Sequence, residues 1–203
     1  MTETILRTFI AIELDAALRA ALSRVQGKYK RQIAPADVRW VAAENIHLTL
    51  KFLGDTPRGR LPELEAALQA ACASHGTFEI SLEGRGCFPN FQRPRVIWVA
   101  VRDRGQALAR LQADIERQVA PLGWPTEARG FSPHLTLGRV ARGVSRTAEA
   151  EIGRIVEKSV VEQIGMQRVA GVSLIQSDLQ PAGPIYTRLL HVSLGPPTLQ
   201  SPD

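Results

Sequence analysis

The stretch His47-Leu48-Thr49-Leu50 occurs twice in this chain of 203 residues, and its second copy is His134-Leu135-Thr136-Leu137. Each copy lies in a short apolar segment that is typical of a β-strand. Side chains alternate between the two faces of a strand, so the histidine and threonine of each copy share one face and the leucines share the other. We therefore predict that the leucines pack beneath helices, while the histidines and threonines line a cleft.

The order of the predicted elements is also repeated along the chain. A strand, a helix, a strand, a helix and a strand come first, over Thr8–Ile12, Leu18–Tyr29, Ile46–Leu53, Leu61–Cys72 and Thr77–Glu83. The series then starts again and ends with one extra strand, over Val96–Val101, Leu108–Val119, His134–Leu137, Ala148–Lys158, Val169–Gln176 and Leu189–Leu194. The two HLTL copies start 87 residues apart, which indicates an internal duplication.

An internal duplication in a chain of this length predicts a single domain made of two pseudo-symmetric lobes. We expect this domain to span residues 1–195, with repeat copies over roughly 5–90 and 93–195, and residues 196–203 to form a loose tail. The predicted fold class is α+β, in which two antiparallel or mixed sheets flank a central cleft and carry helices on their outer faces. Residues that the two copies share then face each other across the cleft.

The composition is that of an ordinary globular protein, with 44% hydrophobic and 22% charged residues. The longest apolar runs, Phe9–Ile12 and Val96–Val101, are far shorter than the roughly 20 residues of a membrane span. Glu13 and Asp15 interrupt the N-terminal region too early for a signal peptide. We therefore expect a cytoplasmic protein without a membrane partner.

The net charge of +5 is carried mainly by arginine, with 21 Arg and 4 Lys. Arginine grips phosphate groups bidentately, so this balance is compatible with a nucleic acid or a nucleotide as the partner. The alternative is that a GC-rich genome encodes arginine in place of lysine.

Two imidazoles that face one cleft predict acid–base chemistry. Histidine titrates near neutral pH, so His47 and His134 can act together, one as a protonated donor and one as a neutral acceptor. The hydroxyls of Thr49 and Thr136 can donate hydrogen bonds to phosphate oxygens, and Arg139 can supply positive charge to the same group. The alternative is that the two histidines are hydrogen-bonded core residues of a duplicated fold.

Other kinds of chemistry have less support in the sequence. Two histidines without a third ligand make a poor zinc site, and Cys72 and Cys87 lack the spacing of a zinc, redox or disulfide motif. No Ser or Cys stands in a nucleophile elbow near either HLTL copy. We therefore expect no metal and no cofactor. The remaining histidines also precede a hydroxyl residue by two positions, and we interpret His75 as a surface residue at a helix end and His191 as a structural strand residue.

The segments Asn45–Gly54 and Phe131–Arg139 resemble the paired H-x-T-x motifs of the two-histidine (2H) phosphoesterase superfamily. Within it, the chain most resembles the bacterial RNA 2',3'-cyclic phosphodiesterase family, historically called 2'-5' RNA ligases, and Arg7–Ile12 is similar to that family's first strand. The resemblance covers nearly the whole chain. It implies hydrolysis of an RNA terminal 2',3'-cyclic phosphate to a 2'-phosphate, with ligation as the reverse reaction.

The resemblance also implies a role for each site residue. His47 is the general acid that protonates the departing O3', and His134 is the base that activates water. Thr49, Thr136 and Arg139 hold the phosphate. Phe52 matches a position where an aromatic ring stacks on the terminal base. That role requires the strand to bulge or turn after Leu50, because positions 47 and 52 are out of phase in a regular strand. The alternative for Phe52 is a core position.

Two further hypotheses about function stay open at this stage. One is a module that binds RNA ends in the same cleft without turnover, which would not need two titrating groups. The other is a 2H phosphodiesterase that acts on small cyclic nucleotides or on 2'-5' oligonucleotides. For the first hypothesis, that of the RNA phosphodiesterase, we expect a monomer whose partner is a single-stranded or tRNA-like RNA that ends in a 2',3'-cyclic phosphate.

Overall fold

Two antiparallel sheets form the framework of the protein, which the computed structural model describes over residues 4–181 and 183–195. Sheet A has the strand order β3-β1-β8-β9, with β1 at Ile5–Glu13, β3 at His47–Pro57, β8 at Gly171–Gln180 and β9 at Gly183–Ser193. Sheet B has the order β2-β6-β5-β4-β7, with β2 at Val38–Trp40, β4 at Phe78–Phe88, β5 at Val96–Arg102, β6 at His134–Val140 and β7 at Gly165–Val169.

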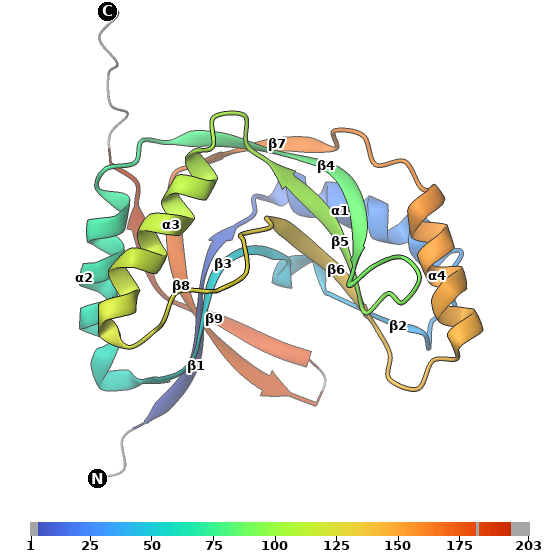
Figure 1. Ribbon diagram of the computed structural model, residues 1–203, viewed down its shortest axis with the longest axis horizontal. Helices are drawn as coiled ribbons and strands as arrows, with labels where there is room; N and C mark the ends of the chain where they lie inside the picture. The colour runs from blue at the N-terminus through green and yellow to red at the C-terminus, as the bar shows by residue number, and fades with distance from the viewer. Residues whose placement is uncertain (1–3, 182, 196–203) are drawn as a thin grey trace, which may run out of the picture.

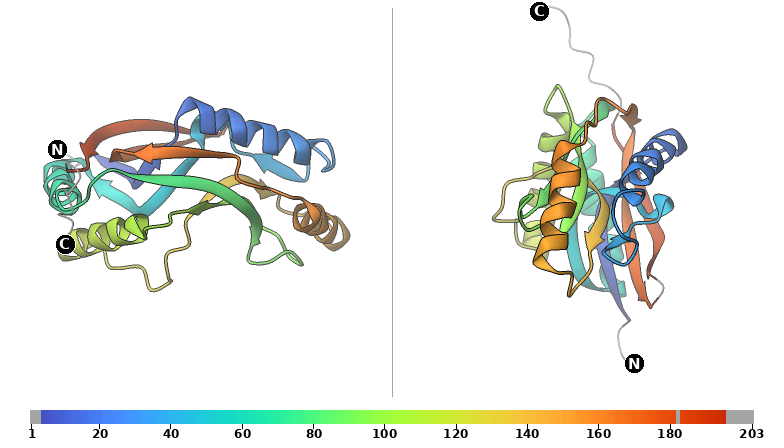
Figure 2. Two further views of the ribbon diagram at one scale, coloured as in Figure 1. Left: turned by 90° about the horizontal axis from the view of Figure 1, so that it is seen from above. Right: turned by 90° about the vertical axis from the view of Figure 1, so that its right-hand side faces the viewer.

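The helices lie around the two sheets (Figures 1 and 2). Their bounds are Ala16–Lys30 for α1, Leu61–Cys72 for α2, Ala107–Val119 for α3 and Arg146–Lys158 for α4, with 3-10 turns η1 at Ala43–Asn45, η2 at Arg58–Arg60 and η3 at Ala120–Leu122. In Figure 1, α2 and α3 pack together at one end, α4 lies at the other, and α1 runs behind the sheets. No described helix is both long and apolar enough to cross a membrane.

Local sequence signals explain where α1 begins and which face it buries. The carboxylate of Asp15 accepts a hydrogen bond from the backbone N–H of Leu18 at 2.7 Å, which satisfies one of the free donors at the helix start. Leu18, Leu22 and Tyr29 recur at helical spacing and are almost fully buried. This face packs against sheet B, where the ring of Tyr29 stacks on Trp40 with 6.3 Å between centroids.

Each sheet contains strands from both halves of the sequence. In sheet A, β1 and β3 from the first half pair with each other, and β8 from the second half adds to β1. In sheet B, β5 and β6 from the second half pair with each other, and β4 from the first half adds to β5. The orders β3-β1-β8 and β6-β5-β4 correspond element by element in the duplicated series. Neither half of the sequence therefore contains a complete sheet of its own.

The predicted α+β class with two antiparallel sheets is confirmed, and each predicted helix and strand overlaps an observed one. Two short strands were missed, β2 and β7, because three and five residues are too few for a clear alternation. The last hairpin is also longer than predicted, since β9 begins at Gly183. The predicted tail at residues 196–203 lies outside the described residues.

Candidate active site

The first HLTL copy opens β3, and its burial follows the predicted alternation. Leu48 and Leu50 are buried, while His47 and Thr49 are half-buried on the opposite face. Pairing with β1 then skips Leu50, because Ala11 pairs with Thr49 and Ile10 with Lys51. This extra residue is a β-bulge, and it changes which face the following side chains occupy.

The second HLTL copy opens β6 with the same alternation and the same irregularity. Leu135 and Leu137 are buried, and His134 and Thr136 are half-buried. Pairing with β5 skips Leu137, the counterpart of Leu50, because Thr136 pairs with Trp98 and Gly138 with Ile97. As a result, Arg139 occupies in this copy the position that Phe52 occupies in the first.

The structure brings the two copies together although they belong to different sheets. Cα atoms of β3 and β6 come within 8 Å of each other, and Figure 1 shows the two strands crossing near the centre of the molecule. A second approach between the two sheets brings Arg139 of β6 near Tyr186 of β9. Burial raises the pKa of the Tyr186 hydroxyl, and the positive charges of Arg139 and Arg7 oppose this effect in part. Arg139 therefore lies near Tyr186 of sheet A.

Both imidazoles are held in the same way. Nδ1 of His47 lies 2.9 Å from the carbonyl oxygen of Asn45, and Nδ1 of His134 lies 2.7 Å from the carbonyl oxygen of Ser132. A carbonyl only accepts hydrogen bonds, so each Nδ1 carries a proton and donates it. The Nε2 atom of each ring is then the one available to take or give a proton.

Aromatic side chains surround each histidine, and the sequence analysis did not identify them as part of the site. The ring of Phe9 stacks on His47 at 4.5 Å between centroids, and Tyr186 meets the same imidazole edge-on at 5.1 Å. His134 has Phe88 at 4.9 Å. Phe9, Tyr186, Ala11 and Ile175 form a small apolar cluster apart from the main core. These contacts limit the rotation of both imidazoles.

The electrostatic surroundings of His47 are dominated by its burial. Burial lowers the pKa of His47 below its ordinary value of 6.5, and the hydrogen bond to Asn45 and the negative charge of Glu13 oppose this effect only in part. In the free protein, the neutral form of His47 is therefore favoured down to a lower pH than for a histidine in water. A pocket of about 550 Å³ opens beside His47, lined by Glu13, Asn45, Tyr186 and Arg188 among others.

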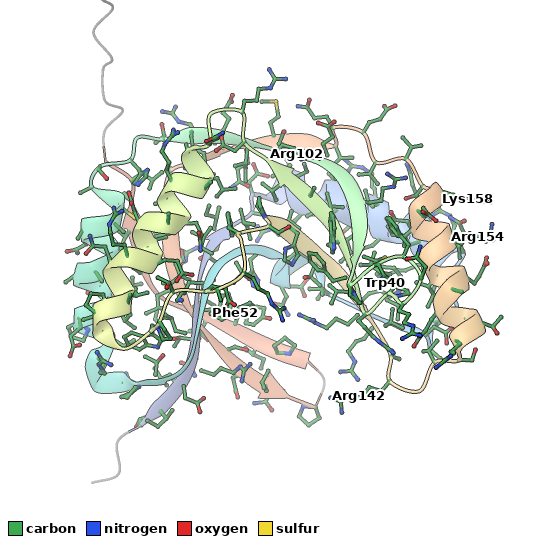
Figure 3. All side chains as sticks on the ribbon, in the orientation of Figure 1. Trp40, Phe52, Arg102, Arg142, Arg154 and Lys158 are labelled. Atoms are coloured by element: carbon green, nitrogen blue, oxygen red, sulfur yellow. The ribbon has the colours of Figure 1, made fainter. Side chains whose placement is uncertain are left out.

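Phe52 lies on the same face of β3 as His47. The bulge at Leu50 supplies the change of phase that this placement requires. The Phe52 ring lies 6.2 Å from that of Phe9, which in turn stacks on His47. Phe52 is 71% exposed, and Figure 3 shows it on the face turned to the viewer. A core position for Phe52, the alternative drawn from the sequence, is therefore wrong.

The other residues that the sequence analysis weighed lie outside this arrangement. His75 was predicted at the surface, but its Nε2 lies 2.7 Å from Asp114 and only 10% of its side chain is exposed. His191 lies in β9, where its Nδ1 is 3.0 Å from Ser173 Oγ. Cys72 and Cys87 are buried, and burial raises their pKa values to about 11 and about 12, so both thiols stay protonated. Residues 4–181 and 183–195 contain no cluster of three His, Cys, Asp or Glu side chains placed to hold a metal.

Comparisons with known proteins agree with this arrangement. The model of the LigT-like phosphoesterase family matches the chain twice, over residues 12–98 and 99–186. An RNA 2',3'-cyclic phosphodiesterase of Methanothermobacter thermautotrophicus is 41% identical over 181 residues, which cover 89% of this chain and 95% of that protein.

Solved structures show the same fold. A crystal structure of a Thermus thermophilus protein has a TM-score of 0.78 and 30% identity, covering 95% of this chain and 100% of that one. The crystal structure of E. coli LigT complexed with 3'-AMP has a TM-score of 0.74 and 26% identity, covering 94% of this chain and 99% of that one. The chain therefore belongs to the LigT-like family of 2H phosphoesterases.

Proposed function

We propose that this protein hydrolyses the 2',3'-cyclic phosphate at the end of an RNA chain and leaves a 2'-phosphate. The observation that carries the proposal is the matched pair of imidazoles, each with Nδ1 bound to a carbonyl and Nε2 available, on two strands that approach each other. The name of the Methanothermobacter relative and its coverage of nearly the whole chain support the same substrate class. Ligation to a 2'-5' linkage is the reverse of the same chemistry.

The proposed reaction uses one proton transfer at each histidine. Water attacks the phosphorus atom while His134 Nε2 takes a proton from it, and the bond between phosphorus and O3' breaks. His47 Nε2 donates its proton to the departing O3', so the phosphate remains on O2'. Thr49 and Thr136 donate hydrogen bonds to the non-bridging oxygens, and Arg139 stabilises the negative charge that develops on them.

The acid role of His47 requires its protonated form, which burial disfavours in the free protein. The substrate supplies the compensation, because a phosphodiester carries a negative charge next to the imidazole and an opposite charge raises a histidine pKa. His47 therefore becomes a competent acid when the substrate binds.

This assignment predicts two different pH profiles. The two limbs of the kcat/KM profile report the apparent pKa values of the histidine pair in the free enzyme, and the lowered pKa of His47 places one of these limbs below pH 6.5, the ordinary value for histidine. The limbs of the kcat profile report the enzyme–substrate complex, and we expect this limb at higher pH there, because the bound phosphate raises the pKa of His47. Initial rates measured across about pH 5 to 8 at low and saturating substrate give both limbs. If neither limb moves to higher pH between the kcat/KM profile and the kcat profile, the proposed effect of the bound phosphate on His47 is contradicted.

A further prediction concerns Phe52, for which we propose stacking on the terminal base. Stacking of a base on an aromatic side chain contributes about 1–3 kcal/mol, so Phe52→Ala should raise KM by about 5-fold to about 150-fold and leave kcat nearly unchanged. The control is Phe52→Tyr, which keeps a ring and should retain the wild-type KM. Because Phe52 is exposed, neither change should lower the melting temperature. Equal KM values for wild type and Phe52→Ala would show that no base stacks there.

We also propose the organisation in which the reaction takes place. Residues 1–195 act as one domain built from two copies, over roughly 5–90 and 93–195, and the exchange of β4 and β8 between the sheets supports this. The enzyme acts as a monomer in the cytoplasm, without a metal or cofactor, on single-stranded or tRNA-like RNA ends. Light scattering of the purified protein tests the monomer, and activity in EDTA tests the metal-free reaction.

The experiment that tests the proposed function compares three short RNAs of one sequence in the presence of EDTA. One ends in a 2',3'-cyclic phosphate, one in a linear 3'-phosphate and one in a 3'-hydroxyl. We expect only the cyclic end to react. Binding of the cyclic end without turnover would favour the RNA-end binding module. Turnover of cyclic mononucleotides but not of the RNA would favour the small-nucleotide enzyme.

A further inference from the structure

Two arginines face each other directly on neighbouring strands at the edge of sheet B. Arg39 in β2 pairs with Arg139 in β6 in the antiparallel register, and both side chains are exposed. Residues that pair in this way project from the same face of a sheet, with Cβ atoms about 4.5–5.5 Å apart. Arg39 therefore stands beside the arginine that the proposed function places on the phosphate.

This shared face is the one that carries His134 and Thr136. The next pair along, Trp40 and Gly138, projects from the other face, because a Cβ on Gly138 would lie 2.9 Å from Trp40 Cε3. Trp40 stacks on Tyr29 of α1, so that other face is the one covered by α1. Successive side chains of a strand point to opposite faces of the sheet. The side chains of Arg39 and Arg139 therefore project away from α1 and toward the site.

Neither guanidinium has a carboxylate partner in the part of the chain that the structure describes. Several other arginines do, among them Arg60 with Glu63, Arg95 with Glu149, Arg117 with Asp114, Arg154 with Glu151 and Arg188 with Glu13. Like charges directly opposite each other in a sheet are destabilising. Two unpaired arginines at such a position favour an anionic ligand, since phosphate groups match the guanidinium fork.

We propose that Arg39 binds the phosphodiester that precedes the terminal nucleotide of the RNA, an inference that rests on the proposed function. Arg139 follows Thr136 on the same strand, and in the proposed function its guanidinium binds the terminal phosphate. Arg39 lies one strand farther out, on the edge strand β2, where the next phosphate of the chain would leave the site. The RNA then runs from the cleft over the edge of sheet B.

This placement makes Arg39 a residue that selects RNA ends over cyclic mononucleotides. A 2',3'-cyclic mononucleotide has no preceding phosphodiester, so it gains nothing from Arg39. An oligonucleotide gains one charge-assisted contact, for which about a 10-fold effect on binding is typical.

The test uses Arg39→Gln, Arg39→Lys and a matched control, Arg24→Gln. Arg24 is an exposed residue of α1, the helix on the opposite face of sheet B. Each variant is assayed with 2',3'-cyclic AMP and with a short RNA that ends in a 2',3'-cyclic phosphate. Binding of the same RNA with a 2'-phosphate end is measured against salt concentration, and melting temperatures report folding.

We expect Arg39→Gln to lower kcat/KM about 10-fold for the RNA and to leave it unchanged for 2',3'-cyclic AMP. A plot of the logarithm of the RNA association constant against the logarithm of the salt concentration should have a slope that is shallower by about 0.7, the value for one phosphate contact on a single strand. Arg39→Lys should keep the salt slope, Arg24→Gln should behave as wild type, and the melting temperature of Arg39→Gln should not fall.

Equal losses on both substrates, or no loss on either, would overturn the role of Arg39. Such results leave the proposed function intact as long as the wild type hydrolyses the RNA. If instead the wild type does not hydrolyse the RNA, the proposed function itself fails.

Discussion

His47→Ala and His134→Ala should each lower kcat by about 10²–10⁴-fold, the loss that is typical when a general acid or base is removed. Each imidazole presents a free Nε2 to the site and is fixed through Nδ1, so alanine removes the proton transfer and leaves the strand in place. We expect the double variant to be little worse than either single one, because both histidines act in one concerted step. Initial rates at saturating substrate measure these effects.

The matched control is His191→Ala, which removes an exposed imidazole from β9 outside the proposed machinery. It should retain the wild-type kcat. A substrate with a better leaving group at O3' should rescue His47→Ala but not His134→Ala, since only the acid becomes dispensable. Equal rescue of both variants, or rescue of His134→Ala alone, would overturn the assignment of acid and base. Both histidines would still belong to the active site.

Lys51→Met should destabilise the protein by about 3–5 kcal/mol, because it leaves a buried carboxylate without its partner. Lys51 Nζ lies 2.6 Å from Glu116 Oε2 in α3 and 2.6 Å from the carbonyl oxygen of Pro125, and the Lys51 and Glu116 side chains are only 6% and 9% exposed. Glu116 also accepts a hydrogen bond from the backbone N–H of Glu127. The ion pair thus ties β3 to the chain that leads into β6.

Urea unfolding of wild type, Lys51→Met, Glu116→Gln and the double variant Lys51→Met/Glu116→Leu measures this effect. The double variant should be more stable than Lys51→Met, because it leaves no unpaired buried charge. The surface pair Arg154–Glu151 provides the control, and Arg154→Gln should leave stability nearly unchanged. A loss below about 1 kcal/mol for Lys51→Met would show that the pair is not buried in solution.

The features that were predicted well depend on local patterns. The alternation of His47, Leu48, Thr49 and Leu50 needs only the geometry of a strand, and the same holds for the second copy. The identity of the copies then placed both histidines on equivalent strands. For Phe52, the strand phase showed that a bulge was needed, and the structure has that bulge at Leu50.

The features that were missed depend on contacts between distant parts of the chain. Tyr186 meets His47 because β9 joins the sheet that holds β3, which follows from the exchange of strands between the two halves. His75 has the sequence context of a surface residue, but its Nε2 contacts Asp114, which lies 39 positions later in the sequence. Lys51 is buried for the same reason, since its partner Glu116 lies 65 positions away. No local pattern contains this information.

The central claim, that a pair of histidines cleaves the bond between phosphorus and O3', is tested most directly by the position of the phosphate in the product. A short RNA that ends in a 2',3'-cyclic phosphate is incubated with the wild-type protein in EDTA, and its new end is identified by phosphorus NMR. The account predicts a 2'-phosphate as the sole product, formed at the same rate with and without the chelator. A 3'-phosphate end, or a reaction that stops in EDTA and returns with added zinc, would contradict it.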